Sequence, residues 1–366
     1  MPDDSNIKKG LRPLSKLYGW GVSLRNKLFD KGTLKSEQFP VPVISIGNLT
    51  VGGTGKTPHT EYLIRLLSKK YKVAVLSRGY KRKTAGFHLA NAQSTAQTIG
   101  DEPFQMFRKF PEVTVAVDGN RRRGIKRLLE LPANQRPEII LLDDAYQHRY
   151  VMPSLSILLT SCQRLFSTDE LLPAGRLREP AENSHRANIV ICTKCPAVGV
   201  PLAVAQQIPL TPQQQLYFSS YEYKGLLPVF PDSTPVKKEN LEHLQKEGYS
   251  LLMVAGLAQP EDMIAYLKEY TTDLQPLLFP DHRDFSKKDL ALIAANYATI
   301  KNEKKLIITS EKDAVRLMDS PLVPEALKSA LYYLPIRVAF CNNQEKLFIQ
   351  QIENHVTNFK GNRSLA

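Results

Sequence analysis

The sequence predicts an α/β protein built on a mostly parallel sheet, with a second, smaller α/β domain after it. Three observations lead to this fold class. First, a Gly-rich loop separates an apolar run from a helical pattern in residues 43–67. Second, short apolar runs alternate with helical or loop stretches in residues 72–194. Third, a Pro- and Gln-rich stretch near residues 205–240 precedes another set of predicted helices and strands. At 366 residues the chain is long enough to form two domains with separate cores.

The N-terminal segment of about residues 11–30 predicts a basic amphipathic helix, and Pro13 suits its first turn. Apolar and basic residues take opposite sides of a helical wheel, namely Leu11, Leu14, Leu17, Tyr18, Val22, Leu24, Leu28 and Phe29 against Lys9, Arg12, Lys16 and Lys27. The pattern is typical of a helix that lies on an anionic membrane surface. It equally suits a helix that packs its apolar stripe onto its own domain, so the residues alone leave both interpretations open.

The segment "VISIGNLTVGGTGKTPHTEYLIRLL" predicts a phosphate-binding P-loop. An apolar strand, Val43–Gly47, leads into small residues whose backbone N–H groups can converge on an anion at the start of a helix from about Lys56. In this motif the lysine reaches the β- and γ-phosphates, and the hydroxyl of Thr57 binds Mg²⁺. The residues expected to hold the nucleotide are Thr50, Val51, Gly52, Gly53, Thr54, Gly55, Lys56 and Thr57. Thr50 stands where the motif usually has its first glycine, and an ordinary Gly-rich turn is the competing interpretation.

The remaining elements follow a βα rhythm. Strands of the first domain are expected at Val73–Leu76, Val113–Val117, Ile139–Leu142, Leu155–Leu159 and Ile189–Cys192. Elements of the second are expected at Leu251–Ala255, Pro260–Tyr270, Lys287–Tyr297, Leu306–Thr309 and Arg337–Phe340, the second and third of these being helices. We therefore predict a P-loop domain over residues 1–215 and a second domain over 216–366 that closes over the active site, its last helix being able to pack back onto the first domain.

Two pairs of carboxylates are placed for metal or proton chemistry. "PEIILLDDAYQHR" ends a buried apolar strand in Asp143 and Asp144, where a P-loop fold puts the carboxylate that holds Mg²⁺ directly or through water. "GDEPFQM" offers Asp101 and Glu102, which we expect on a loop at the same edge of the sheet, within reach of an attacking hydroxyl. A helix cap is the alternative for the first pair. For the second pair, a capped helix start before Pro103 explains the residues equally well.

Several loops carry basic residues. "SRGYKRK", "VDGNRRRG" and "LLPAGRLREP" supply candidates for binding substrate phosphate, because the guanidinium fork matches phosphate oxygens: Arg78, Arg121, Arg122, Arg123, Arg176 and Arg178. We favour Arg176, whose loop carries two prolines and a glycine; a solvated basic face is the alternative for most of the others. "LLFPDHRDFS" puts Asp281 and His282 on a loop of the second domain, where they are either structural or part of a catalytic pair.

Composition narrows the class of protein. With 49 basic and 36 acidic residues the formal net charge is +13, which favours a nucleotide, a nucleic acid or an anionic membrane as partner. The four cysteines are too few for a disulfide framework, and Cys192–Cys195 has no second pair or paired histidines nearby in sequence, so a zinc or redox role is not favoured. No segment approaches the 18 or so apolar residues of a membrane span, and no signal peptide is visible, so a reducing cytosol is expected.

The chain resembles the tetraacyldisaccharide 4′-kinases, the lipid A kinases of Gram-negative bacteria. The resemblance runs from about residue 13 to about 317 and rests on motifs in the same order: "GNLTVGGTGKTP", "SRGYKRK", "GDEPFQM", "VAVDGNRRRG", "LDDAYQHR", "LLPAGRLREP", "TKCP", "AGLAQPEDM", "FPDHRDFS" and "TSEKDAVRL". Thr50 belongs to the family's form of the P-loop. The usual Asp-Asp-Gly reads Asp-Asp-Ala here, and Ala145 is expected to restrict the backbone near the metal.

The resemblance implies transfer of the γ-phosphoryl group of ATP to the 4′-hydroxyl of a tetraacylated glucosamine disaccharide 1-phosphate, a lipid A precursor. It implies that Asp101 is the base on that hydroxyl and His282 its partner, while Lys56 and Arg176 stabilise phosphoryl charge. The residues implied for Mg²⁺ are Thr57, Glu102, Asp143 and Asp144, and those implied for the acceptor are Asn48, Arg78, Arg121, Gln147 and His148. Family members are peripheral proteins on the cytoplasmic face of the inner membrane, which favours the membrane interpretation of the N-terminal helix; no obligate protein partner is inferred.

Two other functions are weighed against this one. A P-loop ATPase or GTPase that couples hydrolysis to partner handling would need neither a lipid acceptor nor Asp101. A nucleic-acid-binding protein would use the net charge of +13, but the sequence lacks the interleaved aromatic and basic motifs of RNA-binding sheets, so nucleic acid is not expected as a partner.

Overall fold

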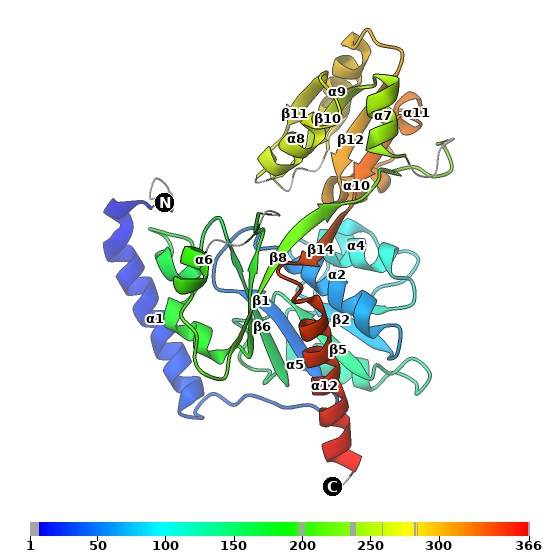
Figure 1. The fold of residues 1–366 in the computed structure, drawn as a ribbon. Coiled ribbons are helices and arrows are strands. Elements are labelled where there is room, and N and C mark those ends of the chain that lie inside the picture. Colours follow the sequence, from blue (N-terminus) through cyan, green and yellow to red (C-terminus); the bar gives the residue numbers. More distant parts are fainter. Residues whose placement is uncertain are drawn as a thin grey trace. The chain divides into compact units, whose positions relative to one another are not determined.

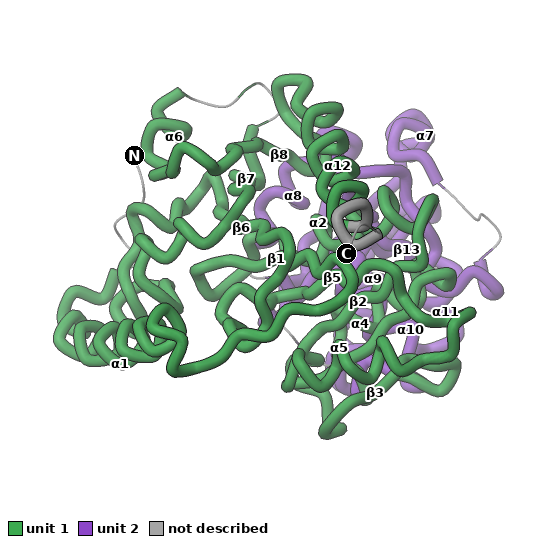
Figure 2. Tube along the Cα trace, turned by 90° about the horizontal axis from the view of Figure 1, so that it is seen from below, with its two compact units in different colours: residues 1–94, 98–221, 338–366 green, residues 95–97, 222–337 purple. Residues whose placement is uncertain are grey.

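The computed structural model describes residues 7–196, 199, 202–234, 239–257, 259–281, 283 and 285–364, with side chains as far as residue 359. The chain divides into two compact units (Figure 2). Unit 1 holds residues 1–94, 98–221 and 338–366, and unit 2 holds 95–97 and 222–337. Unit 2 is therefore shorter than the predicted 216–366, because the chain returns to unit 1 at Val338.

A nine-stranded sheet forms the centre of unit 1 (Figure 1). Its strands are, in spatial order, β14 (Ile336–Phe340), β8 (Gln215–Tyr223), β7 (Ile189–Thr193), β6 (Leu155–Ser161), β1 (Val43–Asn48), β5 (Ile139–Asp143), β2 (Val73–Ser77), β4 (Thr114–Val117) and β3 (His88–Leu89). Every neighbouring pair from β8 to β4 is parallel, and only β3 runs antiparallel to its described partner β4. The mostly parallel sheet predicted from the sequence is confirmed.

Two neighbouring strands, β14 and β8, depart from the prediction in ways that change the domain boundary. β14 was expected in the second domain, yet it lies at the edge of the large sheet, next to β8. β8 itself was missed, since it falls within the Pro- and Gln-rich stretch that was taken as a break. The chain leaves unit 1 through β8 and returns through β14, and these two strands are neighbours in the sheet.

Helices cover both faces of this sheet (Figure 1). One face packs against α2 (Lys56–Leu67), α4 (Asp101–Lys109) and α12 (Glu345–Ser364). The other packs against α5 (Arg121–Leu129) at one end and, at the other, against the segment that contains η3 (Phe166–Thr168) and η4 (Ala181–Arg186). The remaining helical elements are η2 (Lys9–Leu11), α3 (Ala96–Ile99) and α6 (Leu202–Gln206).

The N-terminal helix α1 (Arg12–Asp30) attaches to unit 1 through its small and polar side. The buried residues on it are Ser15, Gly19, Asn26 and Phe29. The Ser15 hydroxyl donates to the Leu171 carbonyl at 2.9 Å, and a Cβ on Gly19 would lie 2.6 Å from a Leu171 methyl, so the helix sits close to that loop. The predicted apolar stripe does not form the main contact with unit 1. Leu14, Leu17 and Leu24 are exposed, because polar bonds hold the helix instead. Within the described residues, no helix is long and apolar enough to cross a membrane.

Unit 2 has a five-stranded sheet of its own. The spatial order is β11 (Leu274–Leu278), β10 (Ser250–Ala255), β12 (Lys305–Ser310), β13 (Leu331–Leu334) and β9 (Leu227–Pro228), with only β9 antiparallel. One face packs against α7 (Leu241–Glu247) and α8 (Glu261–Lys268), and the other against α9 (Lys287–Thr299), α10 (Glu311–Met318) and α11 (Glu325–Lys328). The predicted smaller α/β domain is present.

The C-terminal helix α12 is part of the unit 1 core because Phe348, Ile352 and Val356 recur at helical spacing and are buried there. Phe348 is 1% exposed and stacks on Phe340 with ring centroids 4.4 Å apart.

We expect Phe348→Ala to lower the unfolding free energy of unit 1 by about 3–5 kcal/mol, because it leaves a cavity between helix and sheet. Leu347→Ala is the matched control on the same helix; this side chain is 61% exposed, and its loss should change stability by less than about 0.5 kcal/mol. Urea unfolding followed by circular dichroism measures both. Equal effects of the two changes would contradict the placement of α12.

Candidate active site

The P-loop follows β1 at the carboxyl end of the sheet and leads directly into α2. Gly52 and Gly55 adopt positive φ values of 109° and 85°, a backbone conformation that suits glycine, and Gly55 is the residue before the helix. Hydrogen bonds hold the loop both within its own segment and to the neighbouring segment that contains Arg176. The Asn48 amide donates to the Thr54 hydroxyl at 2.8 Å, and the N–H of Val51 donates to the Arg176 carbonyl at 2.8 Å.

Strand β8 supports the far end of the loop with residues that the sequence analysis did not identify. His59 in α2 lies between the Gly55 carbonyl at 2.8 Å from Nδ1 and the Ser219 hydroxyl at 2.9 Å from Nε2. Burial lowers the pKa of His59 to about 4, so this bridge is neutral. A side chain at Gly55 would collide with the hydroxyl of Tyr221. Because β8 was not predicted from the sequence, no sequence signal connected Ser219 or Tyr221 with the P-loop.

Asp144 holds the basic side chains of the site together. Its carboxylate lies 3.6 Å from Lys56 Nζ and accepts from Arg178 Nη1 at 3.2 and 3.3 Å. Burial alone would raise the pKa of Asp144, but the charges of Lys56 and Arg178 hold it below its usual value, so the group is ionised. Its φ is +48°, an unusual value for a residue with a side chain, and it precedes the buried Ala145.

Asp143 is buried at the end of β5, next to Asp144. It accepts from the hydroxyls of Thr60 at 3.2 Å and Ser77 at 3.3 Å. Burial, followed by the negative charges of Asp144 and Glu102, raises the pKa of Asp143 to about 6. A cation beside Asp143 would favour its ionised form, and the carboxylate oxygens here suit a divalent metal ion.

Asp101 and Glu102 form the first turn of α4. The preceding Gly100 has a φ of +94°, and a Cβ there would lie 3.2 Å from the Cα of Gly79. This close approach brings the loop after β2, which carries Arg78, next to the start of α4. The pair therefore begins a helix, as the simpler interpretation expected, and Glu102 at the same time acts electrostatically on Asp143.

Arg121, Gln147 and His148 surround the Asp143–Asp144 turn. Buried Arg121 donates from Nη1 to the Asp118 carbonyl at 3.0 Å and from Nη2 to the Asp143 carbonyl at 3.3 Å. The Gln147 amide donates to the Asn48 carbonyl at 2.8 Å. Burial, and then the charges of Arg121, Arg25, Arg122 and Arg78, lower the pKa of His148 to about 4.

Three of the residues expected to bind the acceptor carry buried atoms without a hydrogen-bond partner in the described structure. These atoms are Asn48 Oδ1, Arg121 Nε and His148 Nε2. Such atoms are costly unless something binds them. Together with exposed Arg78, they define a cationic region beside the carboxylates.

The other basic candidates have different surroundings. Arg176 is exposed, with Nη1 4.0 Å from the place of a Cβ on Gly52, so it lies beside the P-loop. Arg123 pairs with buried Asp118 at 2.8 Å, which gives it a structural role. Arg178, a predicted phosphate-binding candidate, pairs with Asp144 at 3.2 Å. Lys194 was not singled out, although "TKCP" contains it; its Nζ lies 3.9 Å from the place of a Cβ on Gly53. In unit 2, Asp281 pairs with Lys312 at 3.1 Å, and His282 lies outside the described residues.

Comparisons with known proteins agree on one family. The family profile described as "Tetraacyldisaccharide-1-P 4'-kinase" (LpxK) matches residues 7–357. The chain is 50% identical to the "Tetraacyldisaccharide 4'-kinase" of Parabacteroides distasonis over 361 residues, covering 97% of each chain, and 51% identical to that of Bacteroides fragilis over 363 residues, covering 98% and 96%. A solved structure of LpxK from Aquifex aeolicus, described as an "apo" form in complex with ATP, is 30% identical with a TM-score of 0.72 and covers 95% of this chain and 99% of that one.

The low pKa of His148 predicts a pH dependence of stability. Because the folded-state pKa of about 4 lies below the usual 6.5, the unfolded chain takes up the proton first as the pH falls. The stability contribution present above pH 6.5 is therefore lost progressively down to about pH 4. His148→Gln should show a shallower loss than the parent when unfolding is followed across this range. His185→Gln, an exposed histidine, should keep the parental slope. Parallel slopes for His148→Gln and the parent would contradict the assignment.

Proposed function

The chain belongs to the tetraacyldisaccharide-1-P 4′-kinase family and is a kinase of lipid A biosynthesis, and we propose which of its residues carry out each part of the reaction. The γ-phosphoryl group of ATP passes to the 4′-hydroxyl of the tetraacyldisaccharide 1-phosphate, leaving ADP and the 1,4′-bisphosphate. The observation that carries the proposal is the meeting of the P-loop lysine, two strand-end aspartates and the cationic region of Arg78 and Arg121 at one edge of the sheet.

The residues of the P-loop hold the phosphates of ATP. Backbone N–H groups of residues 50–55 and the start of α2 suit the anionic chain, and Lys56 is placed to leave Asp144 for the β- and γ-phosphates. Arg176 beside Gly52 adds positive charge that stabilises the phosphoryl group. The related structure from Aquifex aeolicus was solved with ATP, which supports this nucleotide.

The carboxylates suit Mg²⁺. Thr57, Glu102, Asp143 and Asp144 would hold it, directly or through water. Burial and the neighbouring charges of Asp144 and Glu102 raise the pKa of Asp143, and a cation there would favour its ionised form. Bound Mg²⁺ neutralises phosphate charge during phosphoryl transfer. Oxygen ligands of this kind are the ones magnesium prefers.

Asp101 takes the proton of the attacking hydroxyl. It begins α4 next to the loop of Arg78, on the same side of the sheet as the P-loop and the aspartates. An oxygen lone pair forms the new bond to the γ-phosphorus, the proton moves to the carboxylate and leaves the O–H electron pair on oxygen, and the bond from the γ-phosphorus to the bridging oxygen breaks with its electrons going to ADP. By family resemblance, His282 of unit 2 is its partner and orients or polarises it.

The acceptor binds in the cationic region. Asn48, Arg78, Arg121, Gln147 and His148 offer donors and one orphaned acceptor to the sugar and its phosphate. Burial keeps the His148 imidazole neutral, so its ring can accept as well as donate. The unpartnered atoms there are explained if the acceptor supplies the missing bonds.

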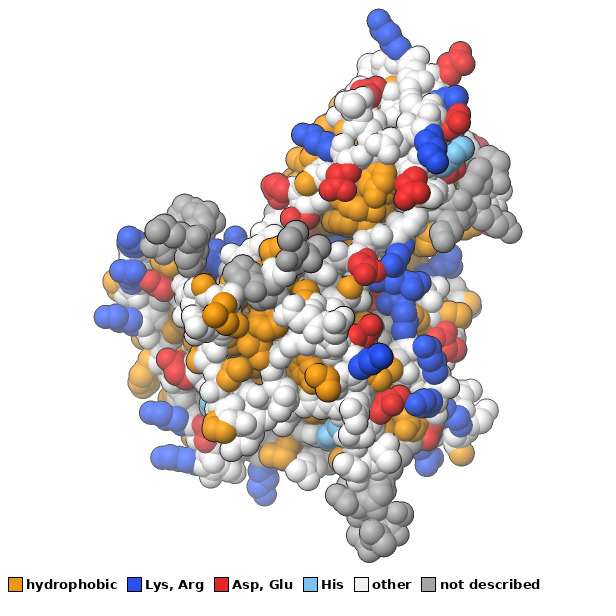
Figure 3. Space-filling model, in the orientation of Figure 1, with side chains coloured by type: hydrophobic (Ala, Val, Ile, Leu, Met, Phe, Trp, Pro, Cys, Tyr) orange, Lys and Arg blue, Asp and Glu red, His pale blue; other side chains and the backbone are white. Residues whose placement is uncertain are grey.

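Helix α1 places the enzyme on an anionic membrane surface at the cytoplasmic face of the inner membrane. Leu14, Leu17, Trp20 and Leu24 are exposed on it, while polar bonds such as Arg12–Glu170 at 2.6 Å hold the opposite side to unit 1. In the space-filling view, Lys and Arg side chains alternate with apolar ones along the edge that α1 forms (Figure 3). Apolar side chains flanked by basic ones are the usual composition of an interfacial helix, and a lipid acceptor requires access to the bilayer.

The alternative of a P-loop ATPase or GTPase that drives partner handling is not favoured, because the family match covers almost the entire chain.

Asp101→Asn and Glu102→Gln separate the proton acceptor from the metal ligand. Asp101→Asn should lower kcat by about 10²- to 10⁴-fold at every Mg²⁺ concentration with the Kd for ATP retained, because only the base is lost. Glu102→Gln should raise the Mg²⁺ concentration needed for half-maximal rate, and excess Mg²⁺ should restore much of kcat. Recovery of Asp101→Asn by excess Mg²⁺ would assign Asp101 to the metal instead.

The membrane role of α1 is tested by flotation with vesicles that contain anionic lipid. Leu14→Ser, Leu17→Ser and Trp20→Ser together should weaken binding by at least about 100-fold, because each apolar side chain contributes more than 1 kcal/mol when it leaves water. Leu202→Ser is the control, since this leucine of α6 is 73% exposed outside α1. Flotation of the triple variant at the level of the control would leave α1 as a structural helix only.

A further inference from the structure

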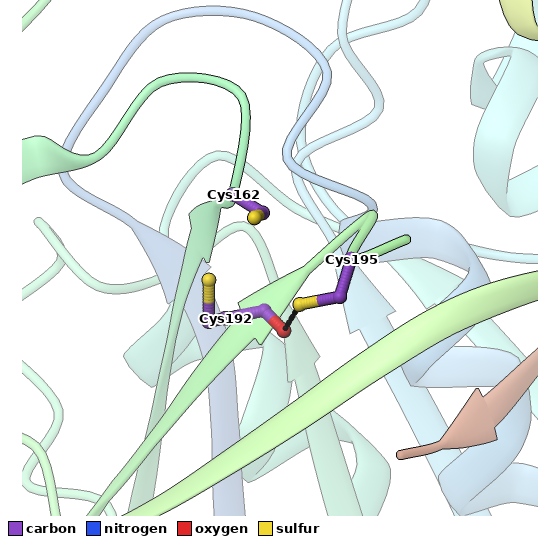
Figure 4. A group of neighbouring side chains, drawn as sticks. All are labelled: Cys162, Cys192 and Cys195. Atoms are coloured by element: carbon purple, nitrogen blue, oxygen red, sulfur yellow. Dashed lines mark hydrogen bonds between the residues drawn. The ribbon is translucent and has the colours of Figure 1, made fainter. Parts of the chain in front are cut away.

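All four cysteines of the chain come together in unit 1, although they are far apart in sequence. Cys162 follows β6, Cys192 lies in β7, Cys195 follows β7 and Cys341 follows β14. The Sγ atoms of the first three lie within 4.8 Å of one another and point into a common space (Figure 4). Cys341 packs against the same apolar cluster as Cys162. The fold thus supplies the further thiols that were missing near Cys192–Cys195 in the sequence.

The positions of these thiols are set by the sheet. The N–H of Cys162 donates to the Thr193 carbonyl at 2.8 Å, that of Cys195 to the Ser219 carbonyl at 2.9 Å, and that of Cys341 to the Phe218 carbonyl at 2.8 Å. These bonds fasten each cysteine to a neighbouring strand, so the group is a rigid feature of the sheet edge. All four are free thiols.

The surroundings are apolar on the protein side and open toward the surface. Cys192 and Cys195 are buried in a cluster with Leu49, Phe166 and Phe218, whereas Cys162 and Cys341 are only partly buried. The Cys195 thiol donates to the Cys192 carbonyl at 3.3 Å.

We propose that Cys162, Cys192, Cys195 and Cys341 form a tetrathiolate site for a soft divalent cation, Zn²⁺, separate from the carboxylate site for Mg²⁺. Zinc binds four sulfurs tetrahedrally at about 2.3 Å, which places the sulfurs about 3.8 Å apart. The three sulfurs within 4.8 Å need only a small contraction to reach this spacing. Binding converts four S–H groups into four Zn–S bonds and releases four protons to water. Thiolates select such a cation over Mg²⁺, which prefers oxygen.

The site is coupled to the P-loop through the residues between Cys192 and Cys195. The Thr193 hydroxyl donates to the Thr54 carbonyl at 2.9 Å and to the Thr160 carbonyl at 3.2 Å. Lys194 has a φ of +57° and brings its Nζ to 3.9 Å from the place of a Cβ on Gly53. A metal that fixes the Cys192–Cys195 turn would therefore hold both residues against the P-loop. This coupling rests on the proposed ATP site, whereas the metal site itself does not.

The experiment measures metal content and metal spectra of the full chain. Protein purified without chelator under reducing conditions should carry one zinc per chain by elemental analysis. The metal-free protein should bind one Co²⁺ with the charge-transfer bands of thiolate ligands. Cys192→Ser with Cys195→Ser should abolish both signals. The control Glu102→Gln, which changes only an oxygen ligand, should keep both.

A second variant covers the case in which the double variant does not fold. Cys341→Ser changes only a partly buried thiol and should weaken Zn²⁺ binding by more than the roughly 10- to 100-fold expected for loss of an outer-shell contact. Removal of zinc from the parent should raise the Kd for ATP while Mg²⁺ is kept in excess.

Several results would overturn the proposal. Zinc far below one per chain, Co²⁺ binding without thiolate bands, or undiminished binding in the cysteine variants would each exclude the site. Two thiols missing from a titration of unreduced protein, and recovered by reductant, would show a disulfide in place of the metal. The same Kd for ATP with and without zinc would contradict the coupling between the metal site and the P-loop.

Discussion

Parallel pairing of β6, β1, β5, β2 and β4 is the constraint on which the rest of the site depends. Because these strands run in one direction, the segments that follow them all emerge at one edge of the sheet. The P-loop after β1, the aspartates after β5 and Arg78 after β2 therefore meet, although they are separated by long stretches of sequence. Close glycine contacts, such as that between Gly79 and Gly100, then bring the start of α4 to the same place.

Ion pairs and hydrogen bonds among its own residues balance much of the charge at this edge of the sheet. Asp144 forms ion pairs with Lys56 and Arg178. Buried Arg121 donates to main-chain carbonyls and lies near Asp143. The arrangement is incomplete, since Asp143 has a raised pKa and three polar atoms nearby lack partners. A nucleotide with its metal ion and an anionic acceptor would supply charges of the kind that are missing. The same residues thus stabilise one another and are available to reactants.

Helix α1 and the cysteine group are two further features of unit 1 that lie outside the carboxylate site. Helix α1 uses hydrogen bonds and a close glycine contact on its inner side, so its leucines and tryptophan remain outside, where the proposed membrane surface would cover them. The cysteine group lies at the ends of β6 and β7, one hydrogen bond from the P-loop through Thr193. In the two proposals, helix α1 binds the lipid surface and the cysteine group binds a soft metal, and each would link the P-loop edge to something other than the substrates.

The sequence by itself determined the features that depend on neighbouring residues. The Gly-rich loop between Val43 and Lys56, the apolar run that ends in Asp143 and the motif order that identifies the family are all readable from short segments, since local pattern reports local structure. Only the tertiary structure decided which segments meet. The return of β14 and α12 to unit 1, the support of Gly55 by Ser219 and Tyr221, the pairing of Arg178 with Asp144 and the gathering of four cysteines depend on strand order across the sheet. Strand order is set by packing between distant parts of the chain, which no single segment contains.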